Sequence, residues 1–433
     1  MTAFDRRRFL GSSLTGVAAL ASGADLFGAD KKASEKDDGK SKKEPSKKES
    51  SSSAPWRDSL FLTWQRDPTT TITIQWIAPS AKATPAVQFA PLDGMIWRPA
   101  ATITKPFVGT DLLVHRCELT GLVPGTEYKF QVGSDKHEHR FRTMPAKMTN
   151  DFSFVSGGDS GVNSHAEATN RLAARQSPHF VLLDGDLAYD NGKAPDVFLG
   201  FVKNYSRDMI DPQGRMIPLI PGIGNHEVNG SYGAKRAGAT SYLSVFDGLY
   251  PEKTYTALDF GDYLSLVTLD TGHIEPIAGE QTAWLEKTLA DRQERSHLIV
   301  AGHVPAYPSY RALDTSEKEK GTGIEQRKHW CPLFERYNVD FVLEHHDHTF
   351  KRTHPLLDGR PDKNGIVYLG DGSWGKLRAP KTPEERPYLA KVSHAYHMTL
   401  HRFEGDQRFH IAMEESGRIA DVCTTFGKRA TRG

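Results

Sequence analysis

Short apolar runs separated by polar turns dominate the chain from residue 151 onward. Four such runs, rich in β-branched and aromatic residues, lie at residues 152–155, 179–183, 298–301 and 339–343. Runs of this kind are typical of strands buried on both faces of a sheet. Residues 279–293 and 330–337 instead place their apolar side chains on one face of a helix. The alternation of the two patterns predicts an α/β domain.

Residues 56–144 show a different pattern, in which short strands alternate apolar and polar positions without a helical stripe. Ile72, Ile74 and Trp76 share one face of such a strand, and a second strand repeats the pattern at 128–132. The run 122–128 is similar to the turn and tyrosine corner of fibronectin type III domains, and Trp76 would be the buried tryptophan of the sandwich. This part of the chain is therefore expected to be an all-β sandwich.

Five short polar motifs follow the apolar runs in order. They are Gly158-Asp159-Ser160-Gly161, Gly185-Asp186-Leu187-Ala188-Tyr189, Gly224-Asn225-His226-Glu227, Val300-Ala301-Gly302-His303 and His346-Asp347-His348. A single Gly-Asp pair is common in turns, so the argument rests on the ordered set. In open α/β sheets, ligands gather beyond the carboxyl ends of the strands. The motifs are therefore expected to meet at one edge of a sheet.

The motifs together supply the donor atoms that a pair of metal ions requires. There are two carboxylates, one phenol, one carboxamide and three imidazoles: Asp159, Asp186, Tyr189, Asn225, His303, His346 and His348. Two neighbouring ions need a bridging ligand, hard oxygen donors for the more highly charged ion and imidazoles for a divalent one. Tyr189 follows Asp186 by three residues, and its phenolate favours a trivalent metal.

In this order the motifs resemble those of the purple acid phosphatases, which belong to the calcineurin-like metallophosphoesterases. The resemblance spans residues 151–426, and the tyrosine at position 189 is what separates the purple enzymes from the rest of the superfamily. It implies Fe(III) bound by Asp159, Tyr189 and His348, and a divalent ion (Fe, Zn or Mn) bound by Asn225, His303 and His346, with Asp186 bridging the two. His226 would contact the phosphate of the substrate instead of a metal.

The resemblance also implies a fold and a division into domains. We expect an α/β, four-layer metallophosphoesterase sandwich, in which two mixed β-sheets are flanked by helices, over residues 150–426. An all-β fibronectin type III-like sandwich would precede it over residues 56–146. The segment 143–150, which contains Pro145, is the expected boundary.

Two positions depart from the family pattern. His345 stands where the family usually has glycine, just before the last pair of ligands, and would crowd the site or add a contact behind it. The loop 308–314 lacks the histidines with which plant members hold substrate. Tyr310 and Arg311 are the candidates to replace them. Substrate preference is therefore not carried over from the family.

The expected chemistry is hydrolysis of small-molecule phosphate monoesters, with a metal-bound hydroxide as the nucleophile. His226, or a protonated Glu227, would stabilise the phosphate or give a proton to the leaving oxygen. One alternative is a phosphodiesterase acting on nucleotides or lipid headgroups. Another is a noncatalytic cell-envelope binding protein in which the β-sandwich carries the binding function. A vestigial site would have lost ligands, whereas all seven positions are filled here.

The N-terminal segment indicates export. Arg6-Arg7-Arg8-Phe9-Leu10 precedes a mildly apolar stretch and small residues, which resembles a twin-arginine signal peptide over residues 1–29. The stretch is too short to span a membrane, which takes about 20 apolar residues. Residues 30–55 are rich in lysine and serine and are expected to be a disordered linker. We therefore expect a periplasmic or secreted protein without a transmembrane segment.

Charge and cysteine content narrow the remaining choices. The 433-residue chain has a formal net charge of +1, and removal of residues 1–29 brings the charge to zero, so no global field favours nucleic acid as a partner. Cys117, Cys331 and Cys423 are far apart in sequence and indicate neither disulfides nor a zinc site. The sequence carries no indication of the number of subunits.

Overall fold

The computed structural model describes residues 56–80, 85–315 and 321–427. The predicted signal peptide and linker lie outside these residues. Within the described part, residues 56 onward belong to one compact unit. The three cysteines are free, in agreement with their spacing. None of the helices in the described ranges combines the length and the apolar character that crossing a bilayer requires.

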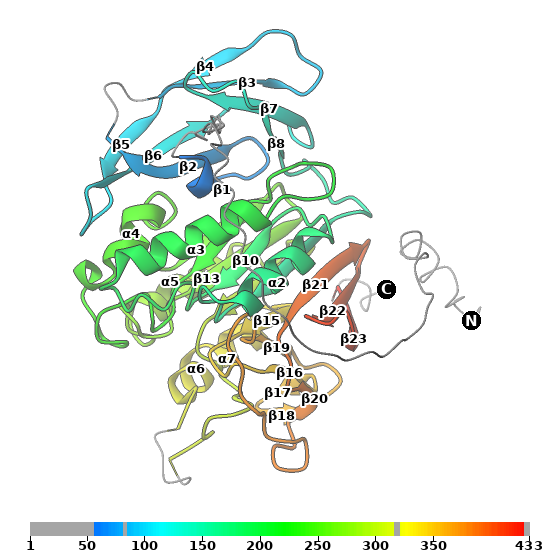
Figure 1. Ribbon diagram of the computed structural model, residues 1–433. Coiled ribbons are helices and arrows are strands. Elements are labelled where there is room, and N and C mark those ends of the chain that lie inside the picture. The colour runs from blue at the N-terminus through cyan, green and yellow to red at the C-terminus, as the bar shows by residue number, and fades with distance from the viewer. Residues whose placement is uncertain (1–55, 81–84, 316–320, 428–433) are drawn as a thin grey trace, which may run out of the picture. The chain divides into compact units, whose positions relative to one another are not determined.

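The N-terminal part is all-β, as predicted (Figure 1). A short 3₁₀ helix, η1 (Arg57–Ser59), precedes two four-stranded sheets. The first sheet consists of β1 (Phe61–Thr63), β2 (Ile72–Pro79), β6 (Leu112–Leu119) and β5 (Ile103–Pro106), and the second of β4 (Arg98–Ala100), β3 (Val87–Pro91), β7 (Glu127–Val132) and β8 (His139–Arg142). Trp76 is fully buried, and the Tyr128 hydroxyl accepts a hydrogen bond from the Val123 N–H at 2.9 Å. This contact is the predicted tyrosine corner.

Two mixed sheets follow. The six-stranded sheet runs in the order β11 (Leu219–Gly222), β10 (Val181–Asp184), β9 (Ser153–Gly157), β21 (His397–Glu404), β22 (Gln407–Glu414) and β23 (Ile419–Phe426). The seven-stranded sheet runs in the order β12 (Thr256–Phe260), β13 (Leu264–Leu269), β14 (His297–Gly302), β15 (Phe341–Glu344), β19 (Val367–Asp371), β16 (Phe350–Thr353) and β20 (Leu389–Ser393). β9, β10 and β11 are parallel, as are β13, β14, β15 and β19. The small hairpin β17 (Leu356–Leu357) and β18 (Arg360–Pro361) lies outside both sheets.

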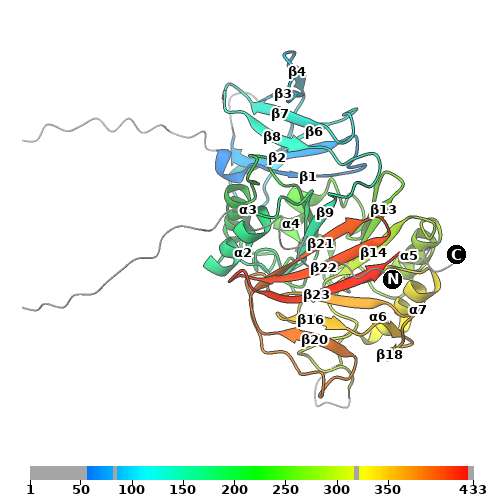
Figure 2. The same ribbon diagram turned by 90° about the vertical axis from the view of Figure 1, so that its right-hand side faces the viewer.

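Helices cover the outer face of each mixed sheet (Figure 2). On one side lie α2 (Ser164–Ala174), α3 (Pro195–Asp208) and α4 (Thr240–Phe246), with the 3₁₀ turn η2 (Arg236–Gly238) before α4; on the other lie α5 (Glu280–Ala290), α6 (Ile324–His329) and α7 (Cys331–Arg336). α2 begins where the Asn163 side chain accepts a hydrogen bond from the Ala166 N–H. α3 begins at Pro195, which needs no N–H partner.

The inner faces of the two sheets pack against each other. The Phe341 ring stacks on His401 with centroids 5.5 Å apart, and Phe403 meets His297 at 4.8 Å. Together with the helical layers, this packing confirms the predicted four-layer arrangement. The four apolar runs that predicted strands correspond to β9, β10, β14 and β15, and the two predicted helices to α5 and α7.

The β-sandwich packs directly on the mixed sheets. Trp64 is fully buried and makes edge contacts with Phe180 and Phe260, with centroids 6.1 Å away in each case. Beside these rings, the Arg116 guanidinium donates to the Val245 carbonyl and pairs with Asp247. Apolar and polar contacts therefore join the two parts of the described chain.

Candidate metal centre

The sequence motifs meet where the parallel strands end. Asp159 and Asp186 each lie two residues beyond the last residue of a strand, β9 and β10 respectively. His303 directly follows β14, and His346 lies two residues after β15. Asn225 comes three residues after β11. The two sheets thus direct five of the candidate ligands to one edge, as the strand pattern predicted.

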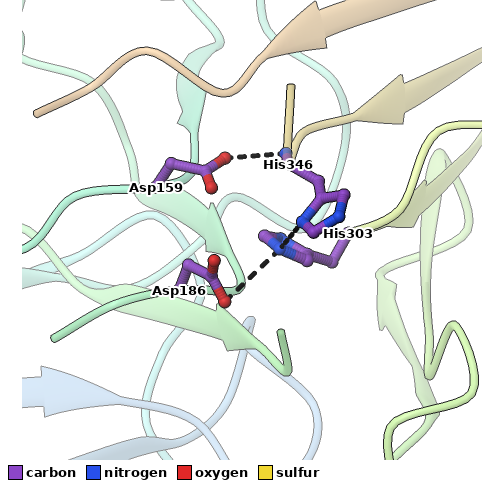
Figure 3. Close-up of side chains that lie close together, drawn as sticks. All are labelled: Asp159, Asp186, His303 and His346. Carbon is purple, nitrogen blue, oxygen red and sulfur yellow. Dashed lines mark hydrogen bonds and ion pairs between the residues drawn. The ribbon is translucent and has the colours of Figure 1, made fainter. Parts of the chain in front are cut away.

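Four of these residues form a tight buried cluster (Figure 3). Asp159, Asp186, His303 and His346 each offer one donor atom, and these atoms all lie within 4.8 Å of one another. The Asp159 carboxylate accepts a hydrogen bond from the His346 backbone N–H at 2.7 Å, which fixes its orientation. Burial of charged groups at this density requires compensating partners.

One group of donors surrounds Asp159. The Tyr189 hydroxyl lies 3.1 Å from Asp159 Oδ1 and 3.1 Å from His348 Nε2, and His348 Nε2 lies 3.0 Å from Asp159 Oδ1. Three ligands of one ion at about 2.1 Å have neighbouring donors about 3 Å apart. The carboxylate, phenol and imidazole therefore have the spacing of ligands to a single ion.

A second group contains two imidazoles. His303 Nε2 lies 3.2 Å from His346 Nδ1, while His303 Nδ1 donates to the Asp184 carbonyl at 2.9 Å. That bond leaves Nε2 of His303 with a lone pair for a cation. The Asn225 side-chain oxygen is buried and has no hydrogen-bond partner among the described residues. An acceptor left in this state fits a ligand of a cation.

Asp186 lies between the two groups. Its Oδ1 accepts from the His226 backbone N–H at 2.8 Å and lies 3.4 Å from His303 Nε2. Its Oδ2 is buried without a hydrogen-bond partner within the described part of the chain. A carboxylate with one free oxygen, next to both donor groups, fits the bridging position.

The backbone at the site is strained. Five of the seven candidate ligands have positive φ angles between 54° and 70°: Asp159, Asp186, Tyr189, His346 and His348. Residues with a side chain rarely adopt this region, and such outliers cluster at functional sites. His346, which follows the unusual His345, is one of these residues.

The electrostatics of the site favour cation binding. Burial, together with the charges of Asp159 and Asp186, raises the pKa of the Tyr189 phenol well above its ordinary value. Burial lowers the pKa of His303, but the carboxylates of Asp186 and Asp159 outweigh it and raise that pKa to about 10. The phenol would thus ionise only where a bound cation replaces its proton.

Glu227 ties the ligand loops together. Its carboxylate, which is fully buried, accepts backbone N–H bonds from Asp186, Leu187 and Gly224, each at 2.7 Å. Burial raises the pKa of Glu227 to about 8, although the donors favour the carboxylate. With both oxygens used in this way, Glu227 holds the loops after β10 and β11 and does not face substrate.

His226 is more open than the surrounding residues. Its ring centroid lies 4.3 Å from that of Tyr189, and its Nε2 lies 3.9 Å from Asp186 Oδ2. Its Nδ1 bonds the Asn191 side chain at 2.5 Å, and 32% of its side chain is exposed. His226 therefore borders the candidate ligands, and its Nε2 makes no hydrogen bond to the residues that the structure describes.

The two departures from the family pattern have distinct outcomes. His345 does not enter the cluster. Its ring packs against Gly158, so closely that a Cβ added to this glycine would lie 2.8 Å from the ring. Its Nε2 lies 3.8 Å from the buried Asp184 carboxylate. Arg311 donates to the Asp347 carboxylate and to the His346 carbonyl. Its charge is thus partly used inside the protein. Tyr310 lies outside the cluster, under Arg378.

Tyr232 is a contact that the sequence pattern did not reveal. Its hydroxyl lies 3.3 Å from His346 Nε2, on the ring nitrogen that does not face His303. It also borders a cavity of about 430 Å³ whose lining includes Ile277, Val304 and Arg311. No motif surrounds Tyr232 in the sequence, so only the path of the loop after Glu227 could have identified it.

Other histidines make contacts with residues outside the candidate ligand set. His401 bonds Ser156 and His410, and His397 bonds Ser373. His165 bonds Glu415. These contacts are structural.

Sequence profiles of two domain families match this chain. The N-terminal domain of purple acid phosphatases matches residues 58–155, and the calcineurin-like phosphoesterase domain matches residues 134–350. The chain belongs to the calcineurin-like phosphoesterase family, and its N-terminal part is similar to the N-terminal domain of purple acid phosphatases. The ordered motifs and the β-sandwich agree with this assignment.

The curated relatives of this chain are distant in sequence. The chain is 27% identical over 304 residues to purple acid phosphatase 15 of Arabidopsis thaliana, an alignment covering 62% of this chain and 56% of that protein. It is 25% identical over 408 residues to acid phosphatase type 7 of Mus musculus, covering 84% of this chain and 89% of that protein. The chain thus spans little more than half the length of the Arabidopsis relative.

The fold is shared with a solved purple acid phosphatase. The structure of a purple acid phosphatase from yellow lupin (Lupinus luteus) seeds superposes with a TM-score of 0.70 at 19% identity, covering 86% of this chain and 74% of that chain. At this identity the likeness shows the fold alone. The chemistry of this chain has to be argued from its own residues.

Proposed function

We propose that this chain is a dinuclear metallohydrolase that releases phosphate from small-molecule phosphomonoesters. The observation that carries the proposal is the arrangement of two donor groups on either side of Asp186, whose Oδ2 has no hydrogen-bond partner within the described residues. Fe(III) would be held by Asp159, Tyr189 and His348, and a divalent ion (Fe, Zn or Mn) by Asn225, His303 and His346. Asp186 would bind both.

Two ions bound there would activate a water molecule for in-line attack and neutralise charge on the phosphoryl oxygens. The protein supplies the rest. His226, which is partly exposed beside Tyr189, would contact the phosphoryl group and protonate the leaving oxygen. The cavity beside His346 would take the leaving group between Tyr232 and apolar side chains.

The test combines metal analysis with turnover of a chromogenic aryl phosphate monoester and the corresponding diester. We expect iron together with a second metal, and a purple band that Tyr189→Phe removes. Monoester hydrolysis should be lost in Asp186→Asn. His394→Asn, at an exposed histidine outside the cluster, is the control and should behave as the wild type.

Each other result favours a different conclusion. Activity without colour would keep the hydrolase and exclude a Tyr189–Fe(III) bond. A higher kcat/KM for the diester would favour a phosphodiesterase. Protein that stays inactive and metal-free after reconstitution would favour the noncatalytic binding protein.

We further propose the domain limits 56–146 and 150–426, and export by the twin-arginine route to the periplasm or the medium. The twin arginines near the N-terminus support the export route. Replacing Arg6, Arg7 and Arg8 by lysine should leave the protein in the cytoplasmic fraction. Equal export of the variant would exclude this route.

A further inference from the structure

Lys376 lies next to the candidate metal centre on a backbone that is firmly held. The preceding residue, Gly375, donates its N–H to the Asp159 carbonyl at 3.1 Å, and its own carbonyl accepts from the Asn163 side chain at 2.7 Å. A Cβ added to Gly375 would lie 2.0 Å from the Ser160 carbonyl oxygen. The position of Lys376 is therefore set by the loop that carries Asp159.

The Lys376 side chain reaches a candidate ligand. It passes Gly161, where an added Cβ would lie 3.3 Å from Lys376 Cε. Its ammonium nitrogen lies over the Tyr189 ring, 4.3 Å from the centroid. The His226 ring borders the same Tyr189 ring, with the two ring centroids 4.3 Å apart. Lys376 and His226 are thus both neighbours of the residue whose hydroxyl touches Asp159 and His348.

Lys376 differs from two other cations near the site, Arg311 and Lys351, because it has no acidic partner among the described residues. Arg311 is paired with Asp347. Lys351 is buried against Glu344. Among the described residues, no carboxylate lies within ion-pair distance of the Lys376 ammonium, which lies over the Tyr189 ring. A half-buried ammonium without an acid, held beside a phosphoryl site, is suited to a phosphate oxygen.

We propose that Lys376 binds the phosphoryl group of the substrate, and the phosphate released from it, on the Tyr189 side of the metal centre. It would thereby make the substrate contact that histidines make in plant relatives, since the loop 308–314 has no histidine. The proposal rests on the proposed phosphatase function. It makes Lys376 a substrate-binding residue, in addition to the seven candidate ligands and His226.

The experiment measures binding of inorganic phosphate to the metal-loaded protein by calorimetry, alongside KM for an aryl phosphate. Lys376→Met should weaken phosphate binding about tenfold or more, the effect of losing one charge-assisted hydrogen bond. It should raise KM to a similar extent while the visible band is retained. Lys376→Arg should restore most of the affinity. Lys287→Met is the matched control, because it removes one positive charge from an exposed position on α5.

Three results would overturn the role of Lys376: unchanged phosphate affinity in Lys376→Met, equal weakening in Lys287→Met, or no rescue in Lys376→Arg. The melting temperature of each variant separates loss of binding from loss of folding. A wild-type protein that neither binds phosphate nor hydrolyses the ester would overturn the proposed function itself. An active wild type with an unaffected Lys376→Met would overturn only the role of Lys376.

Discussion

Single residues at the metal centre are held in conformations that the chain would otherwise avoid. Asp159, Asp186, Tyr189, His346 and His348 all have positive φ, a region that costs a residue with a side chain roughly 1–2 kcal/mol. The hydrogen bonds of Glu227 and the backbone bond from His346 to Asp159 hold these turns in place. The strained turns therefore lower the stability of the fold while they direct these side chains toward the candidate metal centre.

This strain can be measured at His348. In the metal-free protein, His348→Gly should be about 1 kcal/mol more stable than His348→Ala, because both lose the imidazole but only glycine adopts positive φ freely. Urea unfolding of the two variants gives the difference. The same two substitutions at Arg402, in strand β21, are the control, and there the alanine variant should be more stable than the glycine variant. A less stable glycine variant at position 348 would contradict the strain.

His226 should act as an acid. Burial lowers its pKa below the ordinary value of about 6.5, so the imidazolium that can donate from Nε2 forms only as the pH falls below that value. In His226→Gln, kcat/KM for an alkyl phosphate should fall by about 100-fold, and by less for a nitrophenyl phosphate with its better leaving group. The rise in alkyl phosphate turnover toward acid pH should also be lost. Equal slowing of both substrates would exclude general-acid catalysis by His226.

At the scale of elements, the strands that lead to the candidate ligands were the most predictable part. β9, β10, β14 and β15 are fully buried, so each is a continuous apolar run that ends close to a motif residue. Their parallel arrangement brings the ends together, and the candidate cluster follows from that. The sequence also contains a helical pattern at α3, where Phe198, Phe201, Val202 and Tyr205 have the spacing of one helix face.

Other elements depend on contacts that no local pattern contains. β21 pairs antiparallel with β9, with Thr399 opposite Ser156, and so continues a sheet that began over 200 residues earlier. The partner of such a strand is chosen by tertiary packing. The contacts of Tyr232 with His346 and of Lys376 with Tyr189 likewise arise only after distant loops have met.

The loop connections at the metal centre should depend on Glu227. In Glu227→Gln, an amide NH₂ group would face backbone N–H donors, and at least one of the N–H groups of Asp186, Leu187 and Gly224 would lose its acceptor. We expect a loss of about 2–3 kcal/mol in the free energy of unfolding and metal affinity lowered by about tenfold to 100-fold. Urea unfolding and metal titration test this. Glu286→Gln, at a partly exposed position on α5, should change neither the free energy of unfolding nor the metal affinity.

At the scale of the whole molecule, the β-sandwich and the mixed sheets share one apolar core, which contains Leu62 and Trp76 as well as Phe180 and Leu343. Trp64 joins the two parts by its contacts with Phe180 and Phe260. A protein built in this way should unfold in a single transition even though two domain profiles match it.

Trp64→Ala should lower the free energy of unfolding by about 3–5 kcal/mol, because a fully buried ring would leave a cavity between the two parts. Trp64→Phe should lower the free energy of unfolding by less, because it keeps an aromatic ring in the core. It still loses the hydrogen bond from Nε1 to the Thr71 carbonyl. Circular dichroism and loss of bound metal should report the same midpoint. Two separate midpoints in the wild type would show that the parts unfold independently.

The shared core has a consequence for proteolysis. The segment between β8 and β9 is exposed at Ala146 and Lys147, so trypsin can reach the chain there. A cut after Lys147 would break the covalent link while Trp64 and Arg116 still hold the two fragments together. The nicked protein would run as two bands in a denaturing gel and as one particle in a native column. Cleavage of the chain would then be no measure of inactivation.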